Sequence, residues 1–536
     1  MLIPQGMAYA MLAELPPIYG LYAATVPMLM YALLGTSRQL SVGPVALVSL
    51  LVAGGVSGLT DNPAEYIFLT TLLAFMVGII QWLMGVFRLG FLVNYLSSPV
   101  IAGFTSAAAL MIGVSQLKNI LGLAIPRGKI HETLWHVFQN STHIHWATVA
   151  IGLGAMLILF VAKKYKRIPG ALVVVVLGIL MANLLKLEET GLAVLGEIPS
   201  GLPAFILPEF SIINIKKLLP VAFAIAFVGF TQSIAVAKTM EAKRKDHIVD
   251  ANQEMIAIGT ANMVGAFFQS FPIAGGLSRS AVNEQVGAKT TIASIISVGV
   301  IVGTLLFLTP LFYHLPNAVL AAIILVAIIG LVDIDKAFYL WKIHKGDFGL
   351  FMLTAIGTLI LGVQQGIIFG VLLSLAIILY RASNPHIAPL GKIPNSPHFR
   401  NINRFDNLED DSRFIILRID APLFFANLAF VKKGIEKHWK AKPDAEAIVI
   451  SSQPISSVDS SAVEMIQDLV TLYKSRGTEI YFAGLIGPVR DTLIKAEIFE
   501  DLGKNHFFMN LNEALEFLEK GTIHEETRSY VFQGDN

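Results

Sequence analysis

SVGPVAL at residues 41–47 and GGLSRSA at residues 275–281 are two short stretches, broken by glycine, proline or polar residues, inside long apolar regions. At membrane depth, backbone amides without internal hydrogen bonds are tolerated only where they line a cavity enclosed by protein or filled with water. Two such breaks at matching places in two halves of a chain are typical of a site built from discontinuous helices. The second stretch also contains Arg279. The pair therefore predicts a binding site for an anion.

The composition of the chain predicts an integral membrane protein followed by a soluble domain. Of the 536 residues, 54% are hydrophobic and 14% are charged, whereas an ordinary soluble domain has about 25% charged residues. Residues 384–536 contain 17 of the 39 Lys and Arg residues and 22 of the 38 Asp and Glu residues. We therefore expect a membrane domain over residues 1–383, a linker over 384–400 and a soluble domain over 401–536.

Fourteen apolar segments recur along the first part of the chain, and a membrane span takes about 17–25 residues. They lie at about residues 1–15, 19–35, 43–58, 67–86, 97–117, 145–162, 169–185, 218–237, 252–268, 277–287, 290–310, 317–332, 348–364 and 366–381. Two of them are unusually short. The first begins at Met1 without a polar or basic flank, so we expect the first span to be truncated at its N-terminus.

Basic residues predict the orientation of these spans. If the soluble domain is cytoplasmic, counting back places the basic loops at 163–167, 238–247 and 333–347 on the same side. The loops at 14–17 and 61–65, which contain no Lys or Arg, then lie outside. This arrangement follows the excess of Lys and Arg that cytoplasmic loops carry.

The two breaks lie seven spans apart, so the chain reads as two related halves. An odd number of spans in a repeat inverts the second copy, and the short helices after the two breaks then point their N-termini at each other. A helix N-terminus presents unbonded N–H groups and about half a positive charge. We therefore expect the anion to be bound without a metal or a cofactor.

Several motifs in this order resemble the sulfate permease (SulP) family of anion transporters: PQGMAYA at 4–10, PPIYGLY at 16–22, SVGPVA at 41–46 and GLSRSAVN at 276–283. The soluble tail is similar to the STAS domain of that family. The resemblance implies fourteen spans in a seven-plus-seven inverted repeat, with a core domain of spans 1–4 and 8–11 and a gate domain of spans 5–7 and 12–14. It also implies a cytoplasmic STAS domain, a homodimer in the plasma membrane or the bacterial inner membrane, and transport by alternating access.

Side chains of three residues are the first candidates for contact with the anion. Gln5 and Tyr9 match the first-span motif in a form most similar to the sulfate-transporting members, although Gln5 could instead bond another helix and Tyr9 could pack in the core. Arg279 keeps its charge at any physiological pH and can bind an oxyanion in bidentate fashion. A guanidinium within a span marks an ion path unless it extends to the interface. We assign Arg279 to compensate the charge of a divalent anion such as sulfate.

Backbone N–H groups near the two helix starts are the second set of candidates. They belong to Val45 and Ala46 in the first half and to Leu277 and Ser278 in the second. The Ser278 hydroxyl could cap its own helix, which is the common role of serine at a helix N-terminus. A hydroxyl in that place can also bind an anion.

Gln232 leaves the driving force of transport open. Many members of the resembling family have a carboxylate at this position, which is a candidate carrier of a coupling proton or sodium ion. Glutamine cannot titrate, so proton symport through residue 232 is excluded. Glu284 could replace it, although a paired or cytoplasm-facing carboxylate is the simpler interpretation. Exchange against a counter-anion and uncoupled movement through a uniporter or channel stay open, as do bicarbonate, chloride and small dicarboxylates as substrates in place of sulfate.

The tail has the alternation of a small α/β domain. We expect strands at 413–419, 447–450 and 479–483 and helices at 427–439, 460–476, 488–496 and 511–518. Ser460 matches a loop that is phosphorylated in related anti-sigma antagonists, but we prefer a helix cap formed by Asp459 or Ser460 as the explanation of the pattern. The tail is expected to support dimerisation or to dock partners.

An enzyme or a nucleic-acid-binding protein is not expected. Four histidines share one extramembrane stretch, but none has a further ligand at a spacing known for metal sites: His131, His136, His143 and His145.

Overall fold

The computed structural model describes residues 1–91, 97–125, 130–165, 169–244 and 248–521. The chain divides into two compact units, Met1–Leu375 and Ala376–Asn536, and each is described by itself. Parts of two expected basic loops, residues 166–167 and 245–247, lie outside the described residues.

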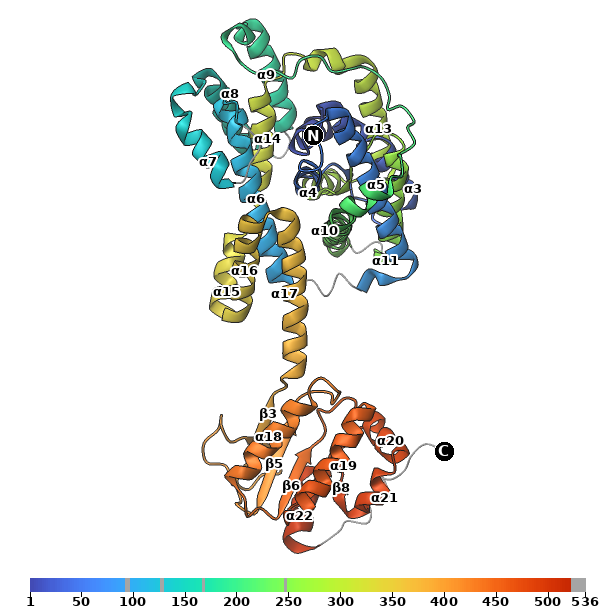
Figure 1. The fold of residues 1–536 in the computed structure, drawn as a ribbon, viewed down its shortest axis with the longest axis vertical. Coiled ribbons are helices and arrows are strands. Elements are labelled where there is room, and N and C mark those ends of the chain that lie inside the picture. Colours follow the sequence, from blue (N-terminus) through green and yellow to red (C-terminus); the bar gives the residue numbers. More distant parts are fainter. Residues whose placement is uncertain (92–96, 126–129, 166–168, 245–247, 522–536) are drawn as a thin grey trace. The chain divides into compact units, whose positions relative to one another are not determined.

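Helices dominate the first unit (Figure 1). They are α1 (Leu2–Leu12), α2 (Pro17–Tyr22), α3 (Val26–Leu34), α4 (Ala46–Val56), α5 (Pro63–Val86), α6 (Ser98–Leu121), α7 (Ile130–Gln139), α8 (Trp146–Lys164), α9 (Gly170–Leu184), α10 (Ile212–Arg244), α11 (Ala251–Ala266), α12 (Leu277–Gln285), α13 (Ile292–Gly303), α14 (Asn317–Ile328), α15 (Ile334–Ile343), α16 (Lys345–Leu361) and α17 (Val363–Ser383).

Each expected apolar segment contains a helix. Among the described residues, seven helical segments are long and apolar enough to cross a membrane: Pro17–Leu34, Pro63–Val86, Ser98–Leu121, Trp146–Lys164, Ile212–Lys243, Ile292–Phe312 and Asn317–Ile343. Helices α7 and α15 lie in stretches that we treated as loops. Both combine polar residues with exposed aromatic side chains such as Trp135 and Trp341, so they lack the uniform hydropathy that marks a span.

Glycines allow the helices of this unit to cross closely. A Cβ atom on Gly20 of α2 would lie 1.9 Å from the carbonyl oxygen of Gly6 on α1. A Cβ atom on Gly259 of α11 would lie 2.8 Å from the carbonyl oxygen of Gly78 on α5, and one on Gly78 would lie 2.7 Å from the carbonyl oxygen of Gly259. Small residues at such contacts let the backbones of membrane helices approach.

The apolar core of the unit contains α1, α4, α10 and α14, whereas outward faces of α8 and α13 expose large apolar side chains. Leu157, for example, is 65% exposed. Apolar surface of this kind is suited to lipid, because a bilayer solvates it as well as a protein core does.

The second unit contains a six-stranded sheet with the order β4-β3-β5-β6-β7-β8. Its strands are β3 (Ile387–Lys392), β4 (Phe399–Asn401), β5 (Phe414–Ile419), β6 (Ala447–Ser451), β7 (Glu479–Ala483) and β8 (Phe507–Phe508). The strands from β5 to β8 are parallel, and β3 is antiparallel to both of its neighbours. Helices α18 (Leu428–Ala441), α19 (Ser460–Lys474) and α20 (Gly487–Lys495) share one apolar cluster with the sheet, and α22 (Leu511–Lys520) shares another; α21 spans Ile498–Leu502.

All seven expected elements of the tail are present. Three strands and one helix were not expected, because they are short or contain proline and glycine: β3, β4, β8 and α21. The segment 384–400, expected to be a linker, contains β3 and most of β4. The register Ile387↔Ile419 makes β3 part of the same sheet as β5.

Candidate anion-binding site

The two broken stretches meet in the structure. Strand β1 (Val42–Gly43) pairs with β2 (Ala274–Gly275) in antiparallel register, and Val42 lies opposite Gly275. The Gly276 N–H donates to the Ser41 carbonyl oxygen at 2.9 Å. The Ser41 N–H donates to Ser280 Oγ, also at 2.9 Å. The second bond joins residues 239 positions apart in the chain.

A helix begins directly after each of the paired strands: α4 at Ala46 and α12 at Leu277. The N-cap residues are Val45 and Gly276, and neither helix has a side-chain cap. The first N–H groups of a helix have no partner within it, so uncapped termini of this kind can bind an anion.

The two termini differ in exposure. Val45 and Ala46 are buried, whereas Leu277 is 53% exposed and Ser278 is also exposed. Ser278 is the second residue of α12 and does not cap it, so the capping interpretation of its hydroxyl is wrong.

Arg279 connects the second half of the site to the first. Its guanidinium Nη1 donates to the Pro44 carbonyl oxygen at 2.8 Å, and Nε lies 3.4 Å from Ser41 Oγ. The side chain is 5% exposed, so it does not extend to a surface. Nη2 is buried without a hydrogen-bond partner among the described residues. Because Nη1 and Nε donate to protein oxygens, Nη2 is the nitrogen that can donate to a ligand.

Two glycines leave the space that this guanidinium occupies. A Cβ atom on Gly276 would lie 2.6 Å from Arg279 Nη2, and one on Gly43 would lie 3.4 Å from the same atom. Gly43 also has a φ of +157°, near the edge of extended backbone, and its Cβ atom would lie 3.8 Å from Leu2 of α1. The start of α1 therefore lies beside the β1 turn and Arg279.

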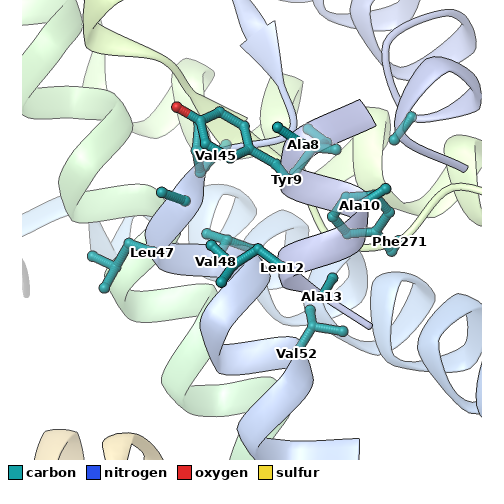
Figure 2. Packing of buried hydrophobic residues seen from close by; sticks show 14 of the residues in the cluster. Ala8, Tyr9, Ala10, Leu12, Ala13, Val45, Leu47, Val48, Val52 and Phe271 are labelled. Atoms are coloured by element: carbon teal, nitrogen blue, oxygen red, sulfur yellow. The ribbon is translucent and has the colours of Figure 1, made fainter. Parts of the chain in front are cut away.

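Helix α1 contributes Gln5 and Tyr9 to this region. Both are buried, and Gln5 Oε1 has no hydrogen-bond partner among the described residues. Figure 2 shows Tyr9 and Val45 among the buried residues of the apolar cluster that also contains Val48. Tyr9 thus packs in the apolar core of the unit.

Helix α10 lies against β2. Gln232 Oε1 is buried without a partner among the described residues. The next residue, Ser233, accepts a hydrogen bond from the Gly275 N–H at 2.8 Å and donates to the Gly229 carbonyl oxygen at 2.6 Å. Glu284 on α12 lies 4.0 Å from the Lys243 ammonium group, in agreement with a paired carboxylate.

Further polar residues, which the sequence patterns did not single out, hold the two strands. They are Ser41, Ser233, Glu254, Asn262 and Ser280, all buried. Their signal was present for Ser233, Glu254, Asn262 and Ser280, since each is a polar residue within an apolar segment and must find a partner when buried. Sequence alone does not say which partner that is.

Hydrogen bonds in the structure account for two further candidates, the cap of α19 and His145. Asp459 caps α19 by accepting a hydrogen bond from the Ala462 N–H at 2.8 Å, while Ser460 is exposed. His145 lies 2.6 Å from Thr148 Oγ1 and 3.0 Å from the Thr190 carbonyl oxygen. Across the described parts of the chain, no group of three or more His, Cys, Asp or Glu residues could hold a metal ion.

Two helices that begin at paired strand breaks inside a helical membrane unit, followed by an α/β domain, define a multi-pass membrane transport protein. Residues 1–354 match the Sulfate permease family and residues 407–514 match the STAS domain. The chain belongs to the sulfate permease family. It is therefore a transporter and not an enzyme.

Relatives and solved structures agree with this membership. Probable sulfate transporter 4.2 of Arabidopsis thaliana is 40% identical, over 96% of this chain and 79% of that protein. Sulfate transporter 4.1, chloroplastic, of the same plant is 37% identical, over 99% and 81%. The structure of the murine Solute Carrier 26 family member A9 anion transporter in the inward-facing state matches with a TM-score of 0.89 at 28% identity, over 96% of this chain and 89% of that chain. The transmembrane domain of the cyanobacterial bicarbonate transporter BicA, at 22% identity and a TM-score of 0.61 over 70% of this chain and 93% of that chain, shares the fold.

Proposed function

We propose that this chain carries sulfate across the membrane by alternating access, with the anion bound between the first turns of α4 and α12. One observation carries the proposal: Nη2 of Arg279 is buried beside the paired strands without a partner among the described residues. Buried polar groups in proteins nearly always have a hydrogen-bond partner. A guanidinium N–H without a protein partner is therefore best explained by a hydrogen bond to a bound ligand. Because the guanidinium is positively charged, that ligand should be an anion.

The neighbouring groups fit an oxyanion. N–H groups of Ala46, Leu277 and Ser278 donate to its oxygens at the two uncapped helix ends. Gln5 and Gln232 each have a buried amide oxygen without a partner among the described residues. Rotation about the terminal bond exchanges the oxygen and nitrogen of an amide, so either glutamine can present donors to the anion. The Tyr9 hydroxyl closes the site on the α1 side.

Sulfate is favoured among the possible anions. The curated relatives at 40% and 37% identity are named as sulfate transporters. A divalent tetrahedral anion also matches a site with donors from both helix ends and one arginine, because each of its oxygens can accept hydrogen bonds.

Coupling through a proton at residue 232 is excluded, because an amide does not titrate. Glu284 lies 4.0 Å from the Lys243 ammonium group, which fits a paired carboxylate better than a replacement for residue 232. Exchange against a counter-anion, or movement without coupling, is the mechanism that these residues favour.

The arrangement in the membrane completes the proposal. The fourteen helical segments cross the bilayer as a seven-plus-seven inverted repeat, and the antiparallel pairing of β1 with β2 supports the inversion. Residues 1–383 form the transport domain, and residues 401–536 form a cytoplasmic STAS domain in a homodimer of the plasma membrane or the bacterial inner membrane. Ser460 stays a candidate for phosphorylation, because it is exposed at the start of α19.

Uptake of radiolabelled sulfate into proteoliposomes tests the proposal. Arg279→Ala should abolish uptake, whereas Arg400→Ala, a matched loss of an exposed arginine in the second unit, should not change it. Native uptake with an unchanged rate in Arg279→Ala would remove Arg279 from the site. No uptake by the native chain would remove sulfate, and competition by bicarbonate, chloride or a small dicarboxylate would then identify the substrate. Stimulation by an anion loaded inside distinguishes exchange from uncoupled movement.

A further inference from the structure

The geometry points to α11 as the helix that positions both halves of the anion site. Two of its residues make the contacts: Glu254 holds the turn before β1, and Asn262 holds the segment before β2. Neither touches the proposed anion-binding groups, so both are positioning residues. The inference rests on the proposed function, because what they position is the gap between the first turns of α4 and α12.

Glu254 is a fully buried carboxylate with four donors. Its Oε1 accepts from the Thr36 N–H and the Thr36 hydroxyl, both at 2.7 Å, and from the Ser37 N–H at 3.0 Å. Its Oε2 accepts from the Tyr31 hydroxyl at 2.8 Å. Every contact uses the carboxylate as an acceptor, which matches its ionised form. The contacts fix the backbone five residues before β1 begins.

Neighbours of Glu254 reinforce the same turn. The Gln253 side-chain amide donates to the Leu34 carbonyl oxygen at 2.9 Å. The Asp250 N–H donates to Thr36 Oγ1 at 3.3 Å. The first turn of α11 therefore holds the chain from the end of α3 to Ser37, and this chain leads directly into β1.

Asn262 makes the corresponding contacts in the other half. Its Oδ1 accepts from the Ile273 N–H at 2.9 Å, and its Nδ2 donates to the Ile273 carbonyl oxygen at 3.3 Å. The amide therefore bonds both backbone groups of the residue directly before β2. Nδ2 also donates to Gln81 Oε1 at 3.1 Å, and Gln81 Nε2 donates to the Ala226 carbonyl oxygen of α10 at 3.1 Å.

A single rigid element spans the two anchors. Asn262 follows Glu254 by eight residues, which is about 12 Å along an α-helix. Helix α11 is in turn locked against α5, where a Cβ atom on Gly259 would lie 2.6 Å from the Trp82 backbone nitrogen. Because the helix cannot stretch, it sets the separation of the two strand starts. Their pairing then sets where α4 and α12 begin.

The test separates positioning from ordinary stability. Full-length protein in detergent is assayed for binding of radiolabelled sulfate and for its melting temperature. Glu254→Gln replaces one carboxylate oxygen by an NH2 group, so at least the bond donated by the Tyr31 hydroxyl is lost or reversed. Asn262→Ala leaves both Ile273 backbone groups without the partners that Asn262 provides. Each should raise the Kd of the folded protein for sulfate about tenfold or more, since a buried unsatisfied group shifts an equilibrium by that order. Thr260→Val is the matched control, because among the described residues the Thr260 hydroxyl bonds within α11, to the Ile256 carbonyl oxygen at 2.7 Å.

If the first two variants do not fold, two milder variants test whether Glu254 and Asn262 position the anion site. Tyr31→Phe removes one of the four donors to Glu254, and Asn262→Asp keeps the acceptor for the Ile273 N–H. Each should raise Kd by about two- to tenfold. Variants that melt at lower temperature but bind sulfate with native Kd would show a purely structural role and overturn the inference. A native chain that binds no sulfate would instead refute the proposed function.

Discussion

Gly276→Ala should weaken anion binding without unfolding the protein. The added Cβ atom would lie 2.6 Å from Arg279 Nη2, 2.7 Å from Cζ and 3.1 Å from Nε. Atoms do not approach a Cβ this closely, so the guanidinium must move. Because it is the far end of a flexible side chain, the backbone can keep its place while the guanidinium leaves the Pro44 carbonyl oxygen, 2.8 Å away.

The size of the effect follows from that bond. A hydrogen bond with a charged partner contributes about 1.5–3 kcal/mol, which corresponds to a rise in Kd of about 10- to 150-fold. We expect this loss for radiolabelled sulfate binding to purified protein and a matching loss of uptake at low sulfate concentration. The melting temperature should change little, since no backbone atom is displaced.

Gly299→Ala is the matched control for this prediction. Gly299 lies in α13, and a Cβ atom there would meet no heavy atom within 4 Å. The variant should bind sulfate as the native protein does and melt at the same or a slightly higher temperature, because alanine favours a helix interior. Native Kd in Gly276→Ala would refute the role of the guanidinium. Loss of the folded state would show that Gly276 is needed by the backbone instead.

Three further predictions concern other parts of the chain. Gly20→Ala should lower the melting temperature markedly, since its Cβ would lie 1.9 Å from a backbone oxygen of Gly6 and overpacking costs about 3 kcal/mol; recovery of monodisperse protein with native melting would contradict this. Asp459→Ala removes a helix cap and should lower the free energy of unfolding of the second unit by about 1 kcal/mol, seen as a lower melting temperature. Sulfate uptake should not change. Hydrogen bonds from Tyr473 and Arg476, both at 2.8 Å, hold the pKa of Glu436 below its ordinary value, so this stabilisation is present above about pH 4.5 and is lost as pH falls through the lowered pKa. Tyr473→Phe should therefore reduce the fall in melting temperature that the native protein shows at acid pH. A fall as large as that of the native protein would disprove this prediction.

Much of the secondary structure could be predicted because its signal is local. A run of apolar residues predicts a membrane helix wherever it lies, and each predicted segment contains a helix. The strands 414–419, 447–451 and 479–483 were likewise visible as apolar runs bounded by polar turns. Strand β3 was not, because residues 387–392 contain proline and glycine and are held in the sheet by β5 and β4.

In the site, too, local signals could be predicted and contacts between distant segments could not. Arg279 was identifiable as a candidate because a guanidinium within an apolar segment is costly wherever it lies. Its partner, the Pro44 carbonyl oxygen, was not, because any of many backbone oxygens could accept that bond. Glu254 and Asn262 were overlooked for the same reason, since their contacts are to Thr36 and Ile273 in other segments.

The sequence by itself determined the class of protein, the helical segments and the two breaks, because hydropathy, charge and chain-breaking residues act on near neighbours. Only the tertiary structure decided that the breaks pair with each other, that two guanidinium nitrogens of Arg279 serve the protein and leave Nη2, and that α11 holds both strands. These depend on which distant groups meet. Hydrogen bonding and close packing settle that question, and both are properties of three-dimensional geometry that no local pattern contains.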